Sequence, residues 1–298
     1  MYYSPLTYHE PLYRPPSEAR SVIFQVTLGC SWNRCTFCSM YNSKQFRIRK
    51  ERELFAEIGA MSRTFPRARR FFLADGDALV LANSKLLPIL EAIKRSFPQV
   101  SRVSAYASPR NLNAKSTEEL TALRKAGLTL IYLGIESGDD EVLHRVEKGE
   151  TAESTVRGLL KARDSGMRTS VMIINGLGGR RYSERHAVAS ARVVTRVEPD
   201  YLSTLVLTIP RLKTEFYRGF DNCFEELTMK GLLEEQRQFL EHTALQHSLF
   251  RSSHASNFLV LKGVLGGDKE RLLSQIDQVL EHADQEYLTM TLHHTDHL

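Results

Sequence analysis

Six short apolar runs alternate with stretches of helical spacing along the first two thirds of this 298-residue chain. The runs are rich in β-branched and aromatic residues and lie at residues 21–28, 70–75, 101–107, 128–136, 168–175 and 200–209. Strands that are apolar almost throughout are typical of a parallel sheet whose faces are both buried. The alternation therefore predicts an α/β fold, either an open doubly wound sheet or a partly closed barrel.

The stretches between these runs predict helices, and one of them carries a clear start signal. Ser116 stands three residues before Glu119, which is a capping-box pattern, and this stretch ends at Gly127. After Pro210 the pattern becomes helical and charged, with a strand-like or irregular stretch at 247–263. We expect an N-terminal extension at 1–20, a core domain at 21–210, and an α-rich C-terminal extension at 211–298 that covers the core.

The composition places the chain among ordinary soluble globular proteins. Hydrophobic residues make up 42% and charged residues 25%, and no apolar run approaches the roughly 20 residues that a membrane span needs. Three of the four cysteines are clustered, which does not match a disulfide framework, so we expect a reducing compartment and a cytoplasmic location. The net charge of +5 permits an acidic partner without requiring one.

The clustered cysteines are Cys30, Cys35 and Cys38, with the spacing C-x4-C-x2-C directly after the first predicted strand. A structural zinc site would need a fourth ligand, and no nearby second motif supplies one. A thioredoxin-like redox pair would use Cys35 and Cys38 and leave Cys30 without a role. A [4Fe–4S] cluster held by three thiolates would leave one iron open to a substrate or cofactor.

The stretch "GCSWNRCTFC" resembles the cluster-binding loop of the radical S-adenosylmethionine superfamily. Phe37, which precedes the last cysteine, matches the family pattern, and so does the position after the first strand. The first spacing differs, because four residues separate the first two cysteines where the family usually has three. The resemblance implies a partial (β/α)6 TIM-like barrel that binds a [4Fe–4S] cluster and S-adenosylmethionine, with Cys30, Cys35 and Cys38 as the metal ligands.

Further matches fall at the ends of successive predicted strands. Gly76 and Asp77 in "ADGDALV" stand where the family has a turn that binds the methionine amino group. The stretches "SAYASPR", "LGIESG" and "IINGLGG" end the next three strands. The resemblance thus implies cofactor contacts from Phe37, Gly76, Asp77, Ser104, Tyr106, Glu136, Ser137, Asn175 and Gly176.

The function that the resemblance implies is reductive cleavage of S-adenosylmethionine to a 5′-deoxyadenosyl radical, which abstracts hydrogen from a small molecule or cofactor precursor. It also implies an electron donor such as flavodoxin or ferredoxin, and no membrane partner; the catalytic residues are not identified. One alternative is RNA modification, which the "GIESG" stretch and the basic pI favour, although no RNA-binding module is evident. The other alternative is a non-enzymatic iron–sulfur redox sensor or electron carrier.

Candidate substrate contacts lie outside these matches. Tyr41, Arg47 and Arg49 follow the cysteines, and the alternation there predicts a strand that presents both arginines on one face. Paired arginines suit a carboxylate or phosphate. His254 and Asn257 lie in a polar stretch of the C-terminal third, where they could donate protons or bind substrate.

Overall fold

The computed structural model describes residues 6–209 and 214–291. The chain divides into two compact units, of which the first comprises residues 1–33, 40–133 and 157–169. The second comprises residues 34–39, 134–156 and 170–298. The boundary therefore falls within helix α6 (Ala152–Asp164) and within strands β6 (Leu128–Glu136) and β7 (Arg168–Asn175), and the two units are built from interleaved segments of the chain.

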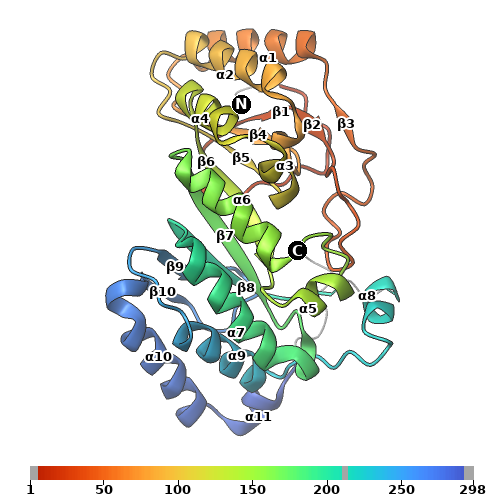
Figure 1. Ribbon diagram of the computed structural model, residues 1–298, viewed down its shortest axis with the longest axis vertical. Coiled ribbons are helices and arrows are strands. Elements are labelled where there is room, and N and C mark those ends of the chain that lie inside the picture. Colours follow the sequence, from red (N-terminus) through yellow and green to blue (C-terminus); the bar gives the residue numbers. More distant parts are fainter. Residues whose placement is uncertain (1–5, 210–213, 292–298) are drawn as a thin grey trace. The chain divides into compact units, whose positions relative to one another are not determined.

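Parallel strands form the core of the first unit, in the order β1 (Val22–Gln25), β4 (Arg70–Ala74), β5 (Arg102–Tyr106) and β6. Phe71 and Phe72 of β4 are fully buried, as expected for a strand that is covered on both faces. Helices α1 (Glu51–Thr64), α2 (Asn83–Ser96) and α4 (Thr117–Ala126) pack against one another along these strands (Figure 1). The short helices of this unit are the 3₁₀ turns η1 (Pro16–Glu18) and η2 (Ala78–Val80) and the α-helix α3 (Pro109–Ala114).

The first predicted strand is interrupted at Val26. The amide of Val26 donates to the carbonyl of Ala74 (2.6 Å), whereas its carbonyl accepts from the amide of Arg49 (3.1 Å). The chain thus changes partners at this residue, and β2 (Thr27–Leu28) pairs antiparallel with β3 (Arg47–Ile48). In the sequence, β2 precedes the cysteine loop and β3 follows it, and both strands belong to the first unit.

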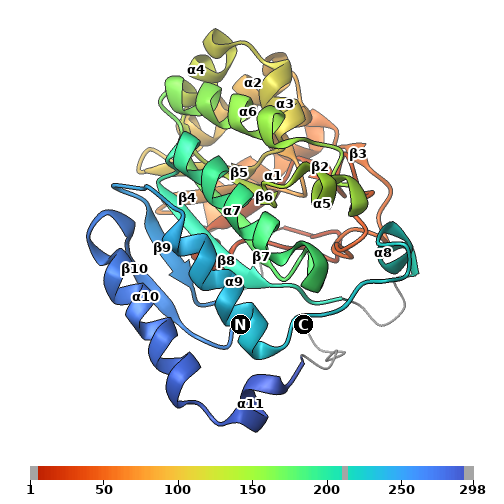
Figure 2. The same ribbon diagram turned by 60° about the horizontal axis from the view of Figure 1, so that its bottom comes forward.

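The second unit continues the α/β pattern and adds one antiparallel strand. Strands β7, β8 (Tyr201–Val206) and β9 (Leu249–Ser252) are parallel, and β10 (Leu261–Val264) runs antiparallel to β9. Helix α9 (Met229–Glu241) packs against α7 (Gly179–Val197) and α10 (Leu265–His282), as Figure 2 shows. The shorter helices are α5 (Asp140–Arg145), α8 (Thr214–Gly219) and α11 (Gln285–Thr289).

The residues after 213 are rich in helix but also contribute β9 and β10 to a sheet. The α/β class predicted from the sequence is confirmed by the parallel strand pairs and the helices that connect them. In the described part of the chain, no helix is both long enough and apolar enough to cross a bilayer.

Candidate functional site

The turn after β4 packs directly on the first cysteine. A Cβ atom placed on Gly76 would lie 2.9 Å from Cβ of Cys30 and 3.1 Å from a ring carbon of Tyr41. Real Cβ atoms do not approach so closely, so only glycine lets this turn reach Cys30. The glycine singled out in the sequence is therefore a close-approach position within the first unit.

Asp77, the next residue, is almost fully buried in the first unit. Its Oδ2 accepts hydrogen bonds from Oγ of Ser31 (3.2 Å) and from the side-chain amide of Asn111. Its Oδ1 is buried and accepts no hydrogen bond of good geometry from the described residues, although the hydroxyl of Ser108 and the amide of Leu79 also stabilise the charge of this carboxylate. Burial raises the pKa of Asp77, because a low-dielectric environment disfavours the charged carboxylate. A buried acceptor left unpaired costs about 1–3 kcal/mol, which a ligand ammonium at this atom would offset.

The middle of the cysteine loop, residues 34–39, is attached to the second unit. The amide of Thr36 donates to the carbonyl of Val146 (3.0 Å), and the amide of Cys38 donates to the carbonyl of Cys35 (3.1 Å). Phe37 packs on an apolar cluster of this unit, made of Val142, Val146, Ile174, Leu177, Tyr182, Ile209, Phe216 and Phe220. The aromatic residue between the last two cysteines is thus an anchor that sets their backbone.

Glu136 ends β6 in a left-handed backbone conformation, with φ of 66°. Its side chain folds back over Gly134, where an added Cβ would lie 1.7 Å from Oε1 of Glu136. Oε1 pairs with Nζ of Lys148 at 3.0 Å, and Oε2 is buried without a partner among the described residues. A non-glycine residue in this conformation costs about 1–3 kcal/mol and is common at functional sites.

Lys148 is a candidate site residue that the sequence reasoning missed. Burial by itself would lower the pKa of its ammonium group, but the charges of Glu136, Cys35 and Cys38 raise the pKa above its ordinary value. The side chain therefore keeps its positive charge beside two of the cysteines. Its only sequence signal would have been its distance of 12 residues from Glu136, which is not a helical or strand period.

Ser137, Asn175 and Gly176 take part in a buried polar network of the second unit. Oγ of Ser137 lies 2.8 Å from Nδ1 of His186, and the side-chain amide of Asn175 donates to the carbonyl of Leu232 (3.0 Å). The amide of Gly176, which has φ of 85°, donates to Oε1 of Glu235 (2.6 Å). These contacts shape the turn after β7, and the cofactor roles of the three residues stay predictions.

Glu235 and His186 are the titratable members of this network. Nε2 of His186 lies 3.7 Å from Oε1 of Glu235, and Oγ of Ser183 donates to Oε2 of Glu235 (2.6 Å). Burial raises the pKa of Glu235 to about 7 and lowers that of His186 to about 4. Helix α9, which carries Glu235, thereby reaches the glycine-rich turn after β7.

Ser104, Tyr106 and Tyr41 lie inside the first unit. Oγ of Ser104 donates to the carbonyl of Phe71 (3.1 Å). The ring of Tyr106 packs edge-on against Phe72 at 5.0 Å, and the buried ring of Tyr41 packs edge-on against Tyr13 at 5.5 Å. The structure thus shows packing roles for these side chains, and their ligand roles stay predictions.

The two arginines after the cysteines differ in environment. Arg47 is exposed, whereas the guanidinium of Arg49 pairs with Glu57 (2.7 Å) and Glu53 (3.4 Å). Burial opposes the charge of Arg49, but Glu57 and Glu53 raise its pKa. Only Arg47 therefore presents its charge to solvent.

His254 and Asn257 lie in a loop of the second unit that is bound to β8. The side-chain amide of Asn257 donates to the carbonyl of Thr204 (2.8 Å), and Nδ1 of His254 lies 2.8 Å from Oγ of Ser256. Burial lowers the pKa of His254. These contacts hold the loop, and a substrate role for either residue stays a prediction.

Cys30 belongs to the first unit, and Cys35 and Cys38 belong to the second. All three are partly exposed and are not in a disulfide. Within the described residues, no three His, Cys, Asp or Glu side chains form a ready-made group of metal ligands. Within the first unit, the thiol of Cys30, the glycine packed against it and the buried carboxylate of Asp77 fit a metal-bound thiolate with a charged ligand nearby.

Two curated proteins are similar to part of this chain. A protein of Methanocaldococcus jannaschii, named provisionally as a methylthiotransferase, is 26% identical over 161 residues, which is 50% of this chain and 34% of that protein. The heme chaperone HemW of Bacillus subtilis is 23% identical over 153 residues, covering 51% of this chain and 40% of that protein. This chain thus aligns with less than half of each relative's length.

Among solved structures, coproporphyrinogen III oxidase (HemN) from Escherichia coli, a radical SAM enzyme, has a similar fold. Its TM-score is 0.58 at 18% identity, and the match covers 74% of this chain and 52% of that chain. This likeness confirms the fold expected from the sequence, an α/β partial TIM-like barrel. The model of the Radical SAM superfamily matches residues 24–191, which is more than half of the sequence. The chain therefore belongs to the radical SAM superfamily, whose enzymes use a [4Fe–4S] cluster and S-adenosylmethionine.

Proposed function

We propose that this protein cleaves S-adenosylmethionine reductively and uses the product to abstract hydrogen from a small molecule or cofactor precursor. In this proposal Cys30, Cys35 and Cys38 hold a [4Fe–4S] cluster through three thiolates. When bound, the cluster and S-adenosylmethionine supply the one-electron chemistry that yields a 5′-deoxyadenosyl radical. The proposal also includes an electron donor of the flavodoxin or ferredoxin type.

The observation that carries the proposal is the buried Oδ1 of Asp77, which no hydrogen bond of good geometry satisfies and which directly follows Gly76, the residue packed on Cys30. An ammonium group is the ligand that such an oxygen favours, because a charge-assisted hydrogen bond satisfies the acceptor and neutralises the buried charge. S-adenosylmethionine carries an ammonium on its methionine part. Ser31 and Asn111 hold Oδ2 of the same carboxylate, so Oδ1 is already oriented before the ligand arrives.

In the second unit, the Glu136–Lys148 pair has a complementary role. The ammonium of Lys148 interacts electrostatically with Cys35 and Cys38. Glu136 holds Lys148 through Oε1 and leaves Oε2 for a hydroxyl or ammonium of a ligand.

The test is anaerobic reconstitution with iron and sulfide, followed by dithionite and S-adenosylmethionine, with mass-spectrometric detection of 5′-deoxyadenosine. The product should appear with the unaltered protein and not with a variant in which Cys30, Cys35 and Cys38 are all alanine. Asp77→Asn should keep its iron content but bind S-adenosylmethionine about 10- to 100-fold more weakly, as expected for a lost hydrogen bond to a charged group.

Two results would contradict the proposal. If a cluster forms but S-adenosylmethionine neither binds nor is cleaved, a redox sensor or electron carrier becomes the better assignment. If the protein binds stoichiometric zinc and takes up no sulfide, the cysteines form a structural site instead.

A further inference from the structure

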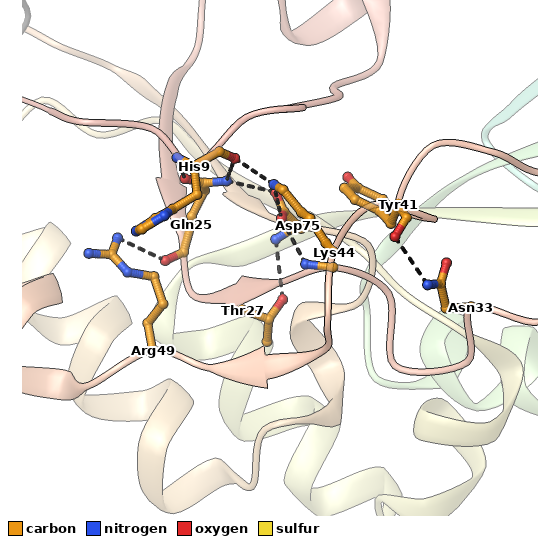
Figure 3. A network of polar contacts seen from close by, with 9 residues as sticks. His9, Gln25, Thr27, Asn33, Tyr41, Lys44, Arg49 and Asp75 are labelled. Atoms are coloured by element: carbon orange, nitrogen blue, oxygen red, sulfur yellow. Dashed lines mark hydrogen bonds and ion pairs between the residues drawn. The ribbon is translucent and has the colours of Figure 1, made fainter.

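Asp75, the residue before the Gly76–Asp77 turn, is fully buried, and both of its oxygens are occupied (Figure 3). Oδ1 accepts a hydrogen bond from Nε2 of Gln25 (3.0 Å). Oδ2 accepts from the amide of Gly29 (2.9 Å) and from Nζ of Lys44 (2.8 Å). The Asp75 amide also donates to the hydroxyl and carbonyl oxygens of Thr27 (3.2 Å each).

Two of these contacts come from opposite ends of the cysteine loop. Gly29 directly precedes Cys30, and Lys44 follows Cys38 by six residues. Gly29 has φ of 75°, a conformation that glycine adopts readily, and its amide is held by Asp75. A single carboxylate oxygen therefore joins the entry and the exit of the loop.

Lys44 is held on a second side by the N-terminal segment. Its ammonium donates to the carbonyl of His9 as well as to Asp75. The side-chain amide of Gln25 closes the arrangement, because its Nε2 donates to the carbonyl of His9 (3.0 Å) and its Oε1 accepts from the amide of His9 (2.9 Å). Only 8% of the Lys44 side chain is exposed, so its ion pair with Asp75 is screened little by solvent.

We infer that Asp75 and Lys44 are positioning residues that hold the cysteine loop closed at its base, so that its thiols are preorganised before iron is bound. The inference rests on the proposed function, because it requires the cysteines to be cluster ligands. Neither side chain is a ligand in this scheme: Asp75 acts through the backbone of Gly29, and Lys44 acts through Asp75. Groups that orient metal ligands in this way commonly change metal affinity by 10- to 100-fold when they are removed.

The experiment measures how fast a reconstituted cluster loses iron to a chelator under anaerobic conditions. Lys44→Met removes the ammonium and keeps the apolar stem, and Asp75→Asn removes the opposite charge at nearly constant shape. Each variant should lose iron about tenfold faster than the unaltered protein. The double variant should lose iron no faster than the worse single variant, because each single change already breaks the contact between Lys44 and Asp75.

Arg102→Met is a matched control in the same unit. Arg102 forms an equally short ion pair, 2.8 Å from the fully buried Glu18, and contacts neither Gly29 nor Lys44. This variant should unfold at a lower temperature yet release iron at the unaltered rate. The unfolding temperature of each iron-free variant shows whether faster iron loss comes from a less stable fold or from a misplaced cysteine loop. If Lys44→Met does not fold, Lys44→Gln takes its place.

Different outcomes refute the positioning role of Asp75 and Lys44 and the proposed function. If the unaltered protein holds a cluster and the Lys44 and Asp75 variants release iron within about twofold of its rate, the positioning role is refuted. The positioning role would also be refuted if the rate of iron loss in the double variant rose by the product of the two single-variant factors. Residues that act independently would give that result. If the unaltered protein takes up no cluster, the proposed function fails and this inference fails with it.

Discussion

Glu235→Gln tests whether the buried network behind the turn after β7 contains a titrating carboxyl. Glu235 accepts from the amide of Gly176 and from the hydroxyl of Ser183, and burial raises its pKa to about 7 from an ordinary value of 4.5. A glutamine has nearly the same shape and can accept from Gly176 while it donates to Ser183. The variant therefore removes the ionisation and keeps the contacts.

Whether this group raises or lowers the free energy of unfolding as the pH rises depends on which state, folded or unfolded, holds the proton on Glu235. Between pH 4.5 and 7 the folded protein keeps the proton on Glu235 that the unfolded chain has lost, so this group lowers the free energy of unfolding as the pH rises. One unit of pKa corresponds to about 1.4 kcal/mol, so the loss amounts to about 3 kcal/mol once the pH is above 7. Glutamine at this position removes that loss.

His186 has the opposite effect over part of this range. Its pKa is lowered to about 4, so it contributes stability that is present above pH 6.5 and is lost as the pH falls toward 4. Between about pH 4.5 and 6.5, Glu235 lowers the free energy of unfolding of the unaltered protein as the pH rises, whereas His186 raises it, so the two contributions offset one another. Comparing the variant with the unaltered protein at each pH removes the part of the His186 contribution that does not depend on the charge of Glu235, which lies 3.7 Å away.

The assay is urea unfolding of the iron-free protein at pH 5 and pH 8. The stability of Glu235→Gln relative to the unaltered protein should rise by about 2.5 kcal/mol between these two values, because part of the loss has already occurred at pH 5. Glu234→Gln is the matched control, since Glu234 is half exposed on the same helix, 3.7 Å from Lys230. Parallel pH profiles of the Glu235 variant and the unaltered protein would refute the reasoning.

Two further substitutions test close packing and helix capping. Gly76→Ala forces a Cβ to within 2.9 Å of Cys30, so it should lower the free energy of unfolding by about 1–3 kcal/mol and reduce iron uptake. Gly267→Ala, whose added Cβ meets nothing within 4 Å, should leave both unchanged or raise stability slightly; equal behaviour of the two variants would count against the packing argument. Ser116→Ala removes a capping box at α4 and should cost about 1 kcal/mol in urea unfolding, and an unchanged midpoint would contradict that role.

Local patterns in the sequence predicted most of the architecture. The apolar runs correspond to strands because both faces of a parallel strand are buried, and Phe71 and Phe72 show this directly. The capping box between Ser116 and Glu119 is present as predicted. Helix α7 begins at Gly179, inside the glycine-rich stretch that follows the fifth predicted strand.

The site was less predictable, because its contacts join residues far apart in the sequence. Asp75 and Lys44 are 31 residues apart, and Gly176 and Glu235 are 59 apart. Periodicity reports only on neighbours within one helix or strand, so it cannot pair such residues. Lys148 was missed for the same reason, whereas Cys30 and Gly76 were found because each lies next to a strand end.

The pairing of β8 with β9 also affects how the chain is made. Ser203 of β8 pairs with Arg251, and more than forty residues, including α8 and α9, separate the two strands. During synthesis from the N-terminus, the edge of β8 that pairs with β9 stays unpaired until the intervening segment and β9 have left the ribosome. An unpaired strand edge is a template for association with other chains. Residues 249–252 cover this edge of β8 once they have been made, and a chain interrupted before them would leave the edge without its strand partner.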